Sequence, residues 1–160
     1  MTQSLKIASI QANPVVGDIP GNLEKAQNHY VKAKADGADI VVFSELFIIG
    51  YAPEDLVLRP SAVTDCKTAC ERLAAETRNG PAIVFSTPWL EEGELYNAAL
   101  FMRGGKITDI RFKHHLPITA CSMKRVYLHQ VRYLIPLILK VFQLGCLSVK
   151  ICGKTRWQTI

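Results

Sequence analysis

The sequence predicts an α/β fold for residues 1–117, and two observations lead to that prediction. Short apolar segments rich in β-branched residues alternate with longer segments whose apolar residues recur at helical spacing. Glycine, proline and asparagine separate these two kinds of segment. The chain has 160 residues, of which 49% are hydrophobic and 21% are charged, a composition typical of a soluble globular protein of about one domain.

The first half of the predicted fold is a strand, a loop, a helix and a second strand. Residues 5–11 (LKIASIQ) are apolar enough for a strand that is covered on both faces. The loop at residues 13–21 holds two prolines and two glycines. We expect a helix capped by Asn22 and ended by Gly37. Residues 40–43 (IVVF) form the next strand, which we expect to be a parallel or close neighbour of the first.

The second half is a helix, a buried strand and a hairpin. Ser61 is expected to cap the helix, which Asn79 and Gly80 end. Residues 82–86 (AIVFS) form the next strand, which Pro88 is expected to end. The hairpin consists of a strand at residues 96–102, a Gly-Gly turn at residues 103–106 and a second strand at residues 107–112.

Two ionisable side chains come directly after predicted strands, Glu45 and Lys113. Ligands of α/β sheets bind just beyond the carboxyl ends of strands. A carboxylate there can take a proton from a nucleophile, and a lysine ammonium can stabilise an oxyanion or deliver a proton to a leaving amine. With a cysteine between them, the two would suit acyl transfer from an amide. The simpler alternatives are a solvated loop carboxylate and a surface cation.

Other kinds of site have little support in the sequence. Cys66 and Cys70 lie four residues apart in a helical pattern and are expected to belong to the core. His114 and His115 would point to opposite faces of a strand, so we expect no metal site. No glycine-rich phosphate loop occurs, so we expect no nucleotide cofactor in this chain. Five cysteines and the absence of an apolar leader in residues 1–6 predict a reducing, cytoplasmic location.

The composition changes sharply after Pro117. All 14 acidic residues lie before it, whereas residues 118–160 contain lysine and arginine but no acid. The net charge of +5 therefore averages a slightly acidic part and a strongly basic tail. A basic tail is one way to bind nucleic acid or anionic lipid. Residues 131–152 are apolar, but their interior lysines and arginine argue against a membrane span.

Several motifs carry a family resemblance. They include Gln11 in the first strand, SELF at residues 44–47 and KxxLP at residues 113–117. With these, residues 5–117 resemble the nitrilase, or carbon–nitrogen hydrolase, superfamily. Two longer stretches are similar to the glutaminase domain of glutamine-dependent NAD synthetases: QANPVVGDIPGN at residues 11–22 and GYAPEDLVLRP at residues 50–60. Residues 50–60 are the more specific indication of a resemblance to that domain.

The resemblance implies an αββα sandwich, of which residues 1–117 would form an incomplete part, and a Glu–Lys–Cys catalytic set. Glu45 matches the general base, and Lys113 matches the lysine that stabilises the tetrahedral intermediate. The family cysteine attacks the amide of L-glutamine and releases ammonia for the amidation of deamido-NAD. That second reaction belongs to a C-terminal synthetase domain, where ATP and Mg²⁺ are expected. The resemblance also implies a homo-oligomer for the intact family.

The resemblance ends at Pro117. The family continues from Leu-Pro with NYGVFDE and later reaches its nucleophile in a CED motif, whereas residues 118–124 read ITACSMK. If the last base of each codon is joined to the first two of the next, permitted codons turn three segments into family-like sequence. Residues 118–124 give YGVFDE, residues 128–140 give ASGPLPDPIDFK and residues 147–153 give VCEDMW.

These three recoveries predict a single-base deletion near Pro117, followed by out-of-frame translation up to Ile160. Residues 118–160 are then an out-of-frame basic tail of doubtful structure. The family nucleophile would be encoded across Ser148 and Val149 and is missing in frame, and neither Cys121 nor Cys152 has the acidic residues that follow it in the family. We therefore expect an inactive N-terminal fragment of the enzyme.

Two alternatives stay open at this point. The chain could be a different nitrilase-type amidase that acts on a small free amide, which residues 50–60 argue against. It could also be a non-enzymatic module whose basic tail contacts nucleic acid or membrane. An out-of-frame origin of the tail argues against that second alternative, so we expect neither nucleic acid nor membrane as a partner.

Overall fold

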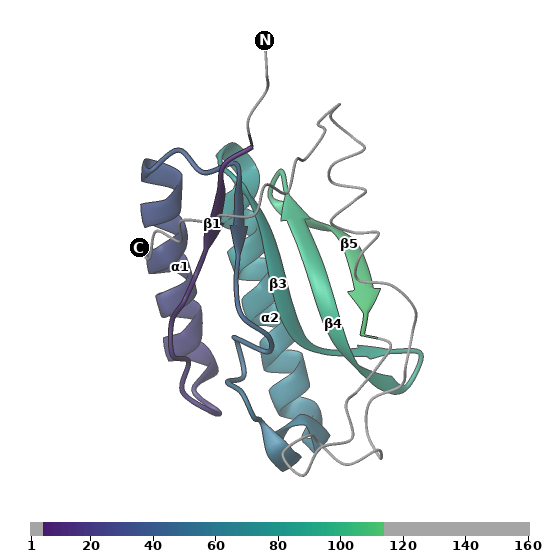
Figure 1. Cartoon of the computed structure of the whole chain (residues 1–160). Helices are drawn as coiled ribbons and strands as arrows, with labels where there is room; N and C mark the ends of the chain where they lie inside the picture. The colour runs from purple at the N-terminus through teal and green to yellow at the C-terminus, as the bar shows by residue number, and fades with distance from the viewer. Residues whose placement is uncertain (1–4, 114–160) are drawn as a thin grey trace, which may run out of the picture.

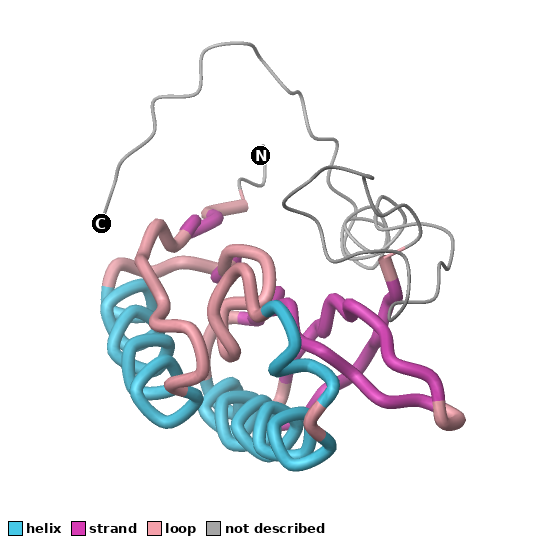
Figure 2. Tube along the Cα trace, turned by 90° about the horizontal axis from the view of Figure 1, so that it is seen from below, coloured by secondary structure: helices cyan, strands magenta, loops and turns pink. Residues whose placement is uncertain are grey.

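A computed structural model describes residues 5–113 and contains one five-stranded sheet with two α-helices on one of its faces (Figure 1). Figure 2 shows the two helices side by side below the strands. The predicted α/β class is confirmed. In chain order, the elements are β1 (Ile7–Ser9), α1 (Ile19–Ala35), β2 (Ile40–Val42), the 3₁₀ helix η1 (Glu54–Leu58), α2 (Pro60–Glu76), the 3₁₀ turn η2 (Thr77–Asn79), β3 (Ala82–Glu91), β4 (Glu94–Arg103) and β5 (Lys106–Phe112).

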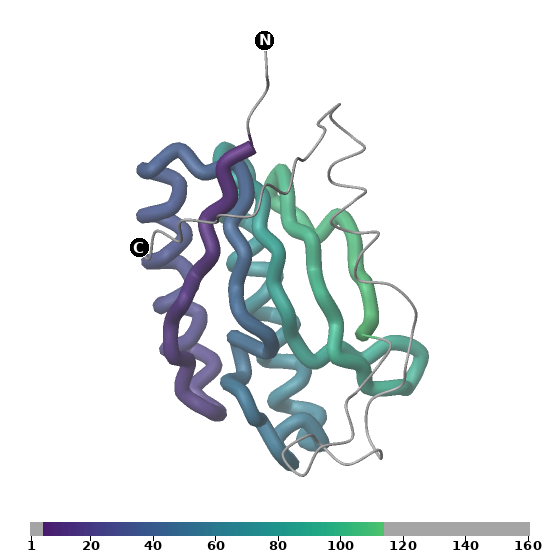
Figure 3. Tube along the Cα trace, in the orientation of Figure 1, coloured from purple at the N-terminus to yellow at the C-terminus, as the bar shows by residue number. Residues whose placement is uncertain are grey.

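The strands lie in the sheet in their order along the chain, as the colour gradient of Figure 3 shows. β1, β2 and β3 pair in parallel, and β3, β4 and β5 pair as antiparallel hairpins. β5 therefore runs in the same direction as β2. The segments that follow β2 and β5 therefore leave the sheet at the same end, although they are far apart in sequence.

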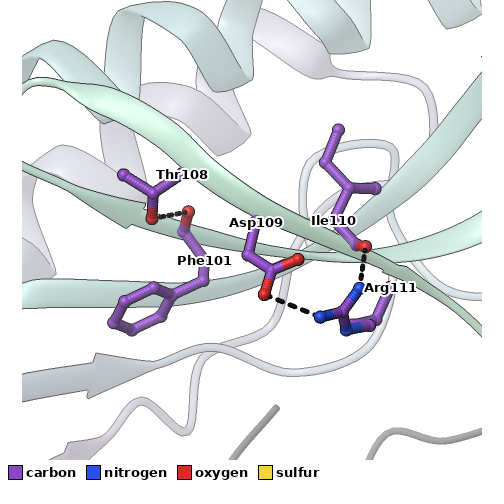
Figure 4. A network of polar contacts seen from close by, with 5 residues as sticks. All are labelled: Phe101, Thr108, Asp109, Ile110 and Arg111. Carbon is purple, nitrogen blue, oxygen red and sulfur yellow. Dashed lines mark hydrogen bonds and ion pairs between the residues drawn. The ribbon is translucent and has the colours of Figure 1, made fainter. Parts of the chain in front are cut away.

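A bulge sets the register of β5 against β4. Asp109 pairs with Phe101, but the next pair along is Ile107 with Met102, so Thr108 is the extra residue. Its hydroxyl donates to the carbonyl oxygen of Phe101 at 3.2 Å, and Asp109 forms an ion pair with Arg111 at 2.9 Å (Figure 4). Because a slip of one residue turns every side chain to the other face, this bulge decides which face the residues after it present.

Each of the two α-helices buries one apolar face. In α1 the buried residues include Leu23, Ala26 and Tyr30, and the helix ends just before Gly37, whose φ is 72°. In α2 the buried residues include Cys66 and Cys70. Both helices thereby cover the same face of the sheet with an apolar stripe.

Two helix caps differ from the prediction. α1 begins at Ile19, and Asp18 rather than Asn22 is its N-cap, with the Asp18 carboxylate accepting from the backbone N–H of Gly21 at 3.0 Å. α2 begins at Pro60, not after Ser61. Proline suits the first turn of a helix because its missing N–H would have no partner there.

Pro88 does not end its strand, which is a further correction. β3 continues to Glu91 and pairs with β4 along its whole length, with Pro88 opposite Asn97. On its other side β3 pairs with β2 only as far as Val84. Beyond that point the β2 side of β3 has no ladder partner among the described residues, so a missing N–H costs nothing there.

Asn22 is instead a buried link between two loops. Its side chain is fully buried, accepts from the N–H of Val15 at 2.8 Å and donates to the carbonyl oxygens of Val15 and Ile48 at 2.7 and 3.0 Å. It therefore joins the loop before α1 to the loop after β2.

Replacement of Asn22 by alanine is expected to lower the free energy of unfolding by about 3 kcal/mol, because it leaves buried backbone groups without partners. Urea unfolding followed by circular dichroism measures this. Asn28→Ala is the matched control, since Asn28 is exposed on the same helix. Equal unfolding midpoints for the two variants would contradict the assigned role.

Within residues 5–113, no helix combines the length and the apolar content that a membrane span requires. The predicted junction at Pro117 lies outside the described residues, as do His114 and His115.

Candidate active site

Glu45 lies in the segment that follows β2, between two buried aromatic residues. The N–H of Phe43 donates to the carbonyl oxygen of Val84 at 3.1 Å and extends the pairing with β3 past the end of β2. The rings of Phe43, Phe47 and Phe85 pack edge to face, with centroids 5.1–5.9 Å apart. The backbone on both sides of Glu45 is thereby anchored in the core, and its carboxylate reaches Asn97 of β4.

Lys113 directly follows β5, and its backbone is held against β4. Phe112 pairs with Ala98, and its ring stacks on that of Tyr96 with the ring centroids 4.3 Å apart. The N–H of Lys113 donates to the carbonyl oxygen of Asn97 at 2.8 Å. The bulge at Thr108 sets this register. Lys113 therefore lies beside Asn97, at the same end of the sheet as Glu45.

The structure brings together the two residues that the sequence predicts for the site. Lys113 Nζ lies 2.6 Å from Glu45 Oε1, across 68 residues of sequence. The two side chains are 26% and 41% exposed. An ion pair this open to solvent adds little to stability. Its significance is that a proton acceptor and a fixed positive charge lie next to one another.

Two further polar residues belong to the site and were not predicted from the sequence, Asn97 and Ser86. Asn97 Nδ2 donates to Glu45 Oε1 at 2.6 Å, and Ser86 Oγ donates to Asn97 Oδ1 at 3.0 Å. The sequence does contain a signal for Asn97, because it is a polar residue within the predicted strand at residues 96–102. The contact of Asn97 with Glu45 could not be predicted in the same way, since that contact depends on pairing between distant strands.

These residues line a cavity of about 240 Å³ between the segment after β2, strands β3 and β4, and Lys113. One part of its wall is polar, and the remainder is apolar. That combination suits a small polar substrate whose reacting group faces the charged end. The lining residues are Phe43, Glu45, Val84, Phe85, Ser86, Asn97, Ala99 and Lys113.

The two described cysteines are not suited to act as nucleophiles. Cys66 and Cys70 are fully buried on α2, as predicted, and neither lines the cavity. Burial raises the pKa of the Cys66 thiol to about 12, against a smaller opposing effect of a hydrogen bond with Thr87. Burial also raises the pKa of Cys70 strongly. Both therefore remain protonated thiols at neutral pH, whereas the thiolate is the reactive form.

We expect iodoacetamide at pH 8 to leave Cys66 and Cys70 unmodified in the folded chain and to label both after unfolding in urea. The reason is that a thiol with a raised pKa holds almost no thiolate at that pH and is closed to the reagent as well. Mass spectrometry of the digested protein measures the labelling of each cysteine. Rapid labelling of either one before urea is added would contradict its placement in the core.

Within residues 5–113, no group of three or more histidine, cysteine or acidic side chains could hold a metal ion.

Comparison with known proteins finds a match to one family over most of the chain. The sequence model described as carbon-nitrogen hydrolase matches residues 6–160. The glutamine-dependent NAD(+) synthetase of Rhodobacter capsulatus is 38% identical over 117 residues, which is 73% of this chain and 21% of that protein. The enzyme of the same name from Thermotoga maritima is 37% identical over 113 residues. The chain spans about a fifth of the length of these relatives.

Solved structures show the same fold. The glutamine-dependent NAD+ synthetase from Acinetobacter baumannii, in complex with ADP, matches with a TM-score of 0.74 and 28% identity, covering 89% of this chain and 31% of that one. An amidase from Nesterenkonia sp. matches with a TM-score of 0.68 at 20% identity, covering 81% of this chain and 49% of the amidase. At that identity the second likeness concerns the fold alone.

Proposed function

The chain belongs to the carbon–nitrogen hydrolase family, and from that membership we propose that residues 5–113 are part of a domain that hydrolyses L-glutamine to supply ammonia for NAD synthesis. Homology to glutamine-dependent NAD synthetases supports the substrate. The observation that carries the proposal is the contact between Glu45 Oε1 and Lys113 Nζ, at 2.6 Å, on the wall of a cavity lined by β3 and β4.

The proposed reaction uses a cysteine thiol that this chain lacks in frame. Glu45 takes the thiol proton while sulfur bonds to the amide carbon, and the Lys113 ammonium stabilises the oxyanion that forms. The carbon–nitrogen bond then breaks as Glu45 returns the proton to the leaving nitrogen, and ammonia departs from a thioester. Water then attacks the thioester carbon and gives a proton to Glu45. The carbon–sulfur bond breaks, glutamate is released, and Glu45 returns the proton to the thiolate sulfur.

The remaining steps belong to the part of the relatives that this chain does not span. We assign the use of ammonia, with ATP and Mg²⁺, to that part, and expect the intact enzyme to be a cytoplasmic homo-oligomer. No cofactor is proposed for residues 5–113, because the reaction above needs only a nucleophile, a base and a fixed positive charge.

We propose that the chain itself is inactive, because the family nucleophile is not encoded in its reading frame. The family match extends to residue 160, so it does not by itself mark a break at Pro117. Support for the break comes from the loss of acidic residues after that position and from the family-like sequence recovered in the shifted frame.

The coding DNA tests the break. Reading across codons 116–119 and onward, we expect the shifted frame to encode YGVFDE and, later, CED. Codons for residues 147–153 that cannot give CED in the shifted frame would refute the proposal.

The purified 160-residue chain provides the matching activity test. We expect it to release no ammonia from L-glutamine above the rate of a buffer blank, because no cysteine attacks the amide. Ammonia and glutamate produced in equal amounts would show that a nucleophile is present after all.

A second candidate is a related amidase that acts on small free amides, as the likeness to the Nesterenkonia fold allows. The relatives in sequence favour glutamine, since both are glutamine-dependent NAD synthetases. In a protein with its frame restored, faster hydrolysis of acetamide than of glutamine would select the second candidate.

A further inference from the structure

Asn97 is a buried amide in an otherwise apolar part of β4. Its side chain is 4% exposed, and the residues that follow it in the strand, Ala98, Ala99 and Leu100, belong to the core. A polar group buried in such a place costs free energy unless its hydrogen bonds are made. Its contacts therefore indicate what it does.

The side-chain amide and the backbone carbonyl of Asn97 both contact the site. Its Nδ2 donates to Glu45 Oε1 at 2.6 Å, and its Oδ1 accepts from Ser86 Oγ at 3.0 Å. Its backbone carbonyl oxygen accepts from the N–H of Lys113 at 2.8 Å. One residue thus touches both charged partners, one through its side chain and the other through its backbone.

The chemistry of the partners fixes which way the amide faces. A carboxylate only accepts hydrogen bonds, so it requires the NH₂ group, and the hydroxyl of Ser86 is free to donate to the amide oxygen. A flipped amide would place its oxygen against the Glu45 carboxylate. The Glu45 carboxylate therefore sets the orientation of the Asn97 amide, and Ser86 donates to the amide oxygen in that orientation.

We propose that Asn97 is a positioning residue that fixes the Glu45 carboxylate beside Lys113, a role that rests on the proposed function of Glu45 as base. Both Asn97 and Lys113 donate to Oε1. Oε2 is the oxygen that takes the thiol proton, because Oε1 is already held by two donors.

The first test is spectroscopic and needs no catalysis. In the ¹⁵N-labelled 160-residue chain, the side-chain amide signals of Asn97 are assigned by their loss in Asn97→Ala. We expect Glu45→Gln to displace these signals more than those of any other asparagine side chain, and Ser86→Ala to displace them too. Glu24→Gln, an exposed carboxylate on α1, is the control and should leave them in place.

Two results of this test would overturn the proposal. One is an Asn97 amide that Glu45→Gln does not displace. The other is a wild-type chain without dispersed amide signals, which would contradict the site itself. Neither result depends on whether the chain hydrolyses glutamine, so the proposed function and the role of Asn97 can fail separately.

The second test uses the frame-restored protein, translated after one base is inserted at the Pro117–Ile118 codons. Asn97→Ala should lower kcat on the order of 100-fold with KM within about threefold, because the base is misplaced while substrate binding is kept. Thr87→Val is the control, since Thr87 is a fully buried polar residue of β3 that does not line the cavity. An equal kcat for the two variants would overturn the positioning role.

Discussion

Glu45→Gln in the frame-restored protein is expected to lower kcat for glutamine hydrolysis about 100- to 10,000-fold, which is the usual contribution of a general base. Glutamine keeps the size of the side chain, and its amide oxygen can still accept from Asn97 and Lys113. It cannot take a proton from a thiol. The loss should therefore fall on the chemical step, with binding of the substrate kept.

Ammonia release, coupled to the oxidation of NADH by glutamate dehydrogenase, measures this effect. Glu24→Gln serves as control because it removes an exposed carboxylate from α1, at a distance from the cavity lining. A Glu45→Gln protein that works within threefold of the control would remove Glu45 from the mechanism.

Gly50→Ala is expected to lower the free energy of unfolding by about 3 kcal/mol. Gly50 has a φ of 84°, which L-residues rarely adopt, and a Cβ there would lie 2.6 Å from Cα of Val16. That neighbour is backbone and cannot rotate away. The N–H of Gly17 donates to the carbonyl oxygen of Ile49 at 2.8 Å, which holds the two loops together at this point.

Gly37 offers a matched control for this substitution. It has a similar φ of 72°, but a Cβ added to it would have no neighbour within 4 Å. Gly37→Ala should therefore cost only the backbone strain, roughly 1–2 kcal/mol. Urea unfolding of both variants separates the cost of backbone strain from the cost of the close approach to Val16. An equal loss of free energy of unfolding in the two variants would show that the contact between the two loops is unimportant.

The contact between Gly50 and Val16 also connects the two sequence stretches that resemble NAD synthetases. Residues 11–22 and residues 50–60 were recognised by resemblance alone. In the structure they meet where Gly50 lies against Val16, and the side chain of Asn22 donates to the carbonyl oxygen of Ile48, two residues before the second stretch. The small residue at position 50 and the amide at position 22 are requirements of that packing.

The elements of the fold could be predicted because each has a local signal. Apolar runs marked β2 and β3, helical spacing marked α1 and α2, and a Gly-Gly turn marked the hairpin of β4 and β5. The errors arose where tertiary contacts override a local preference. Asn22 is a good cap by type, but its side chain is used to join two loops, and Pro88 lies in a strand because one side of that strand needs no partner.

The site could be predicted in part. Glu45 follows β2 and Lys113 follows β5, and these two strands run in the same direction, so both side chains lie toward the same end of the sheet. Asn97 could not be assigned to the site, because its contact with Glu45 depends on the pairing of β2 with β3 and of β3 with β4. Such pairing between distant segments has no local sequence signal.

Glutamine hydrolysis by the frame-restored protein, compared with the 160-residue chain, tests the central claim most directly. We expect the restored protein to release ammonia and glutamate in equal amounts and the 160-residue chain to release neither. Hydrolysis by the 160-residue chain, or none by a folded frame-restored protein, would contradict the account of Glu45, Lys113 and the missing cysteine.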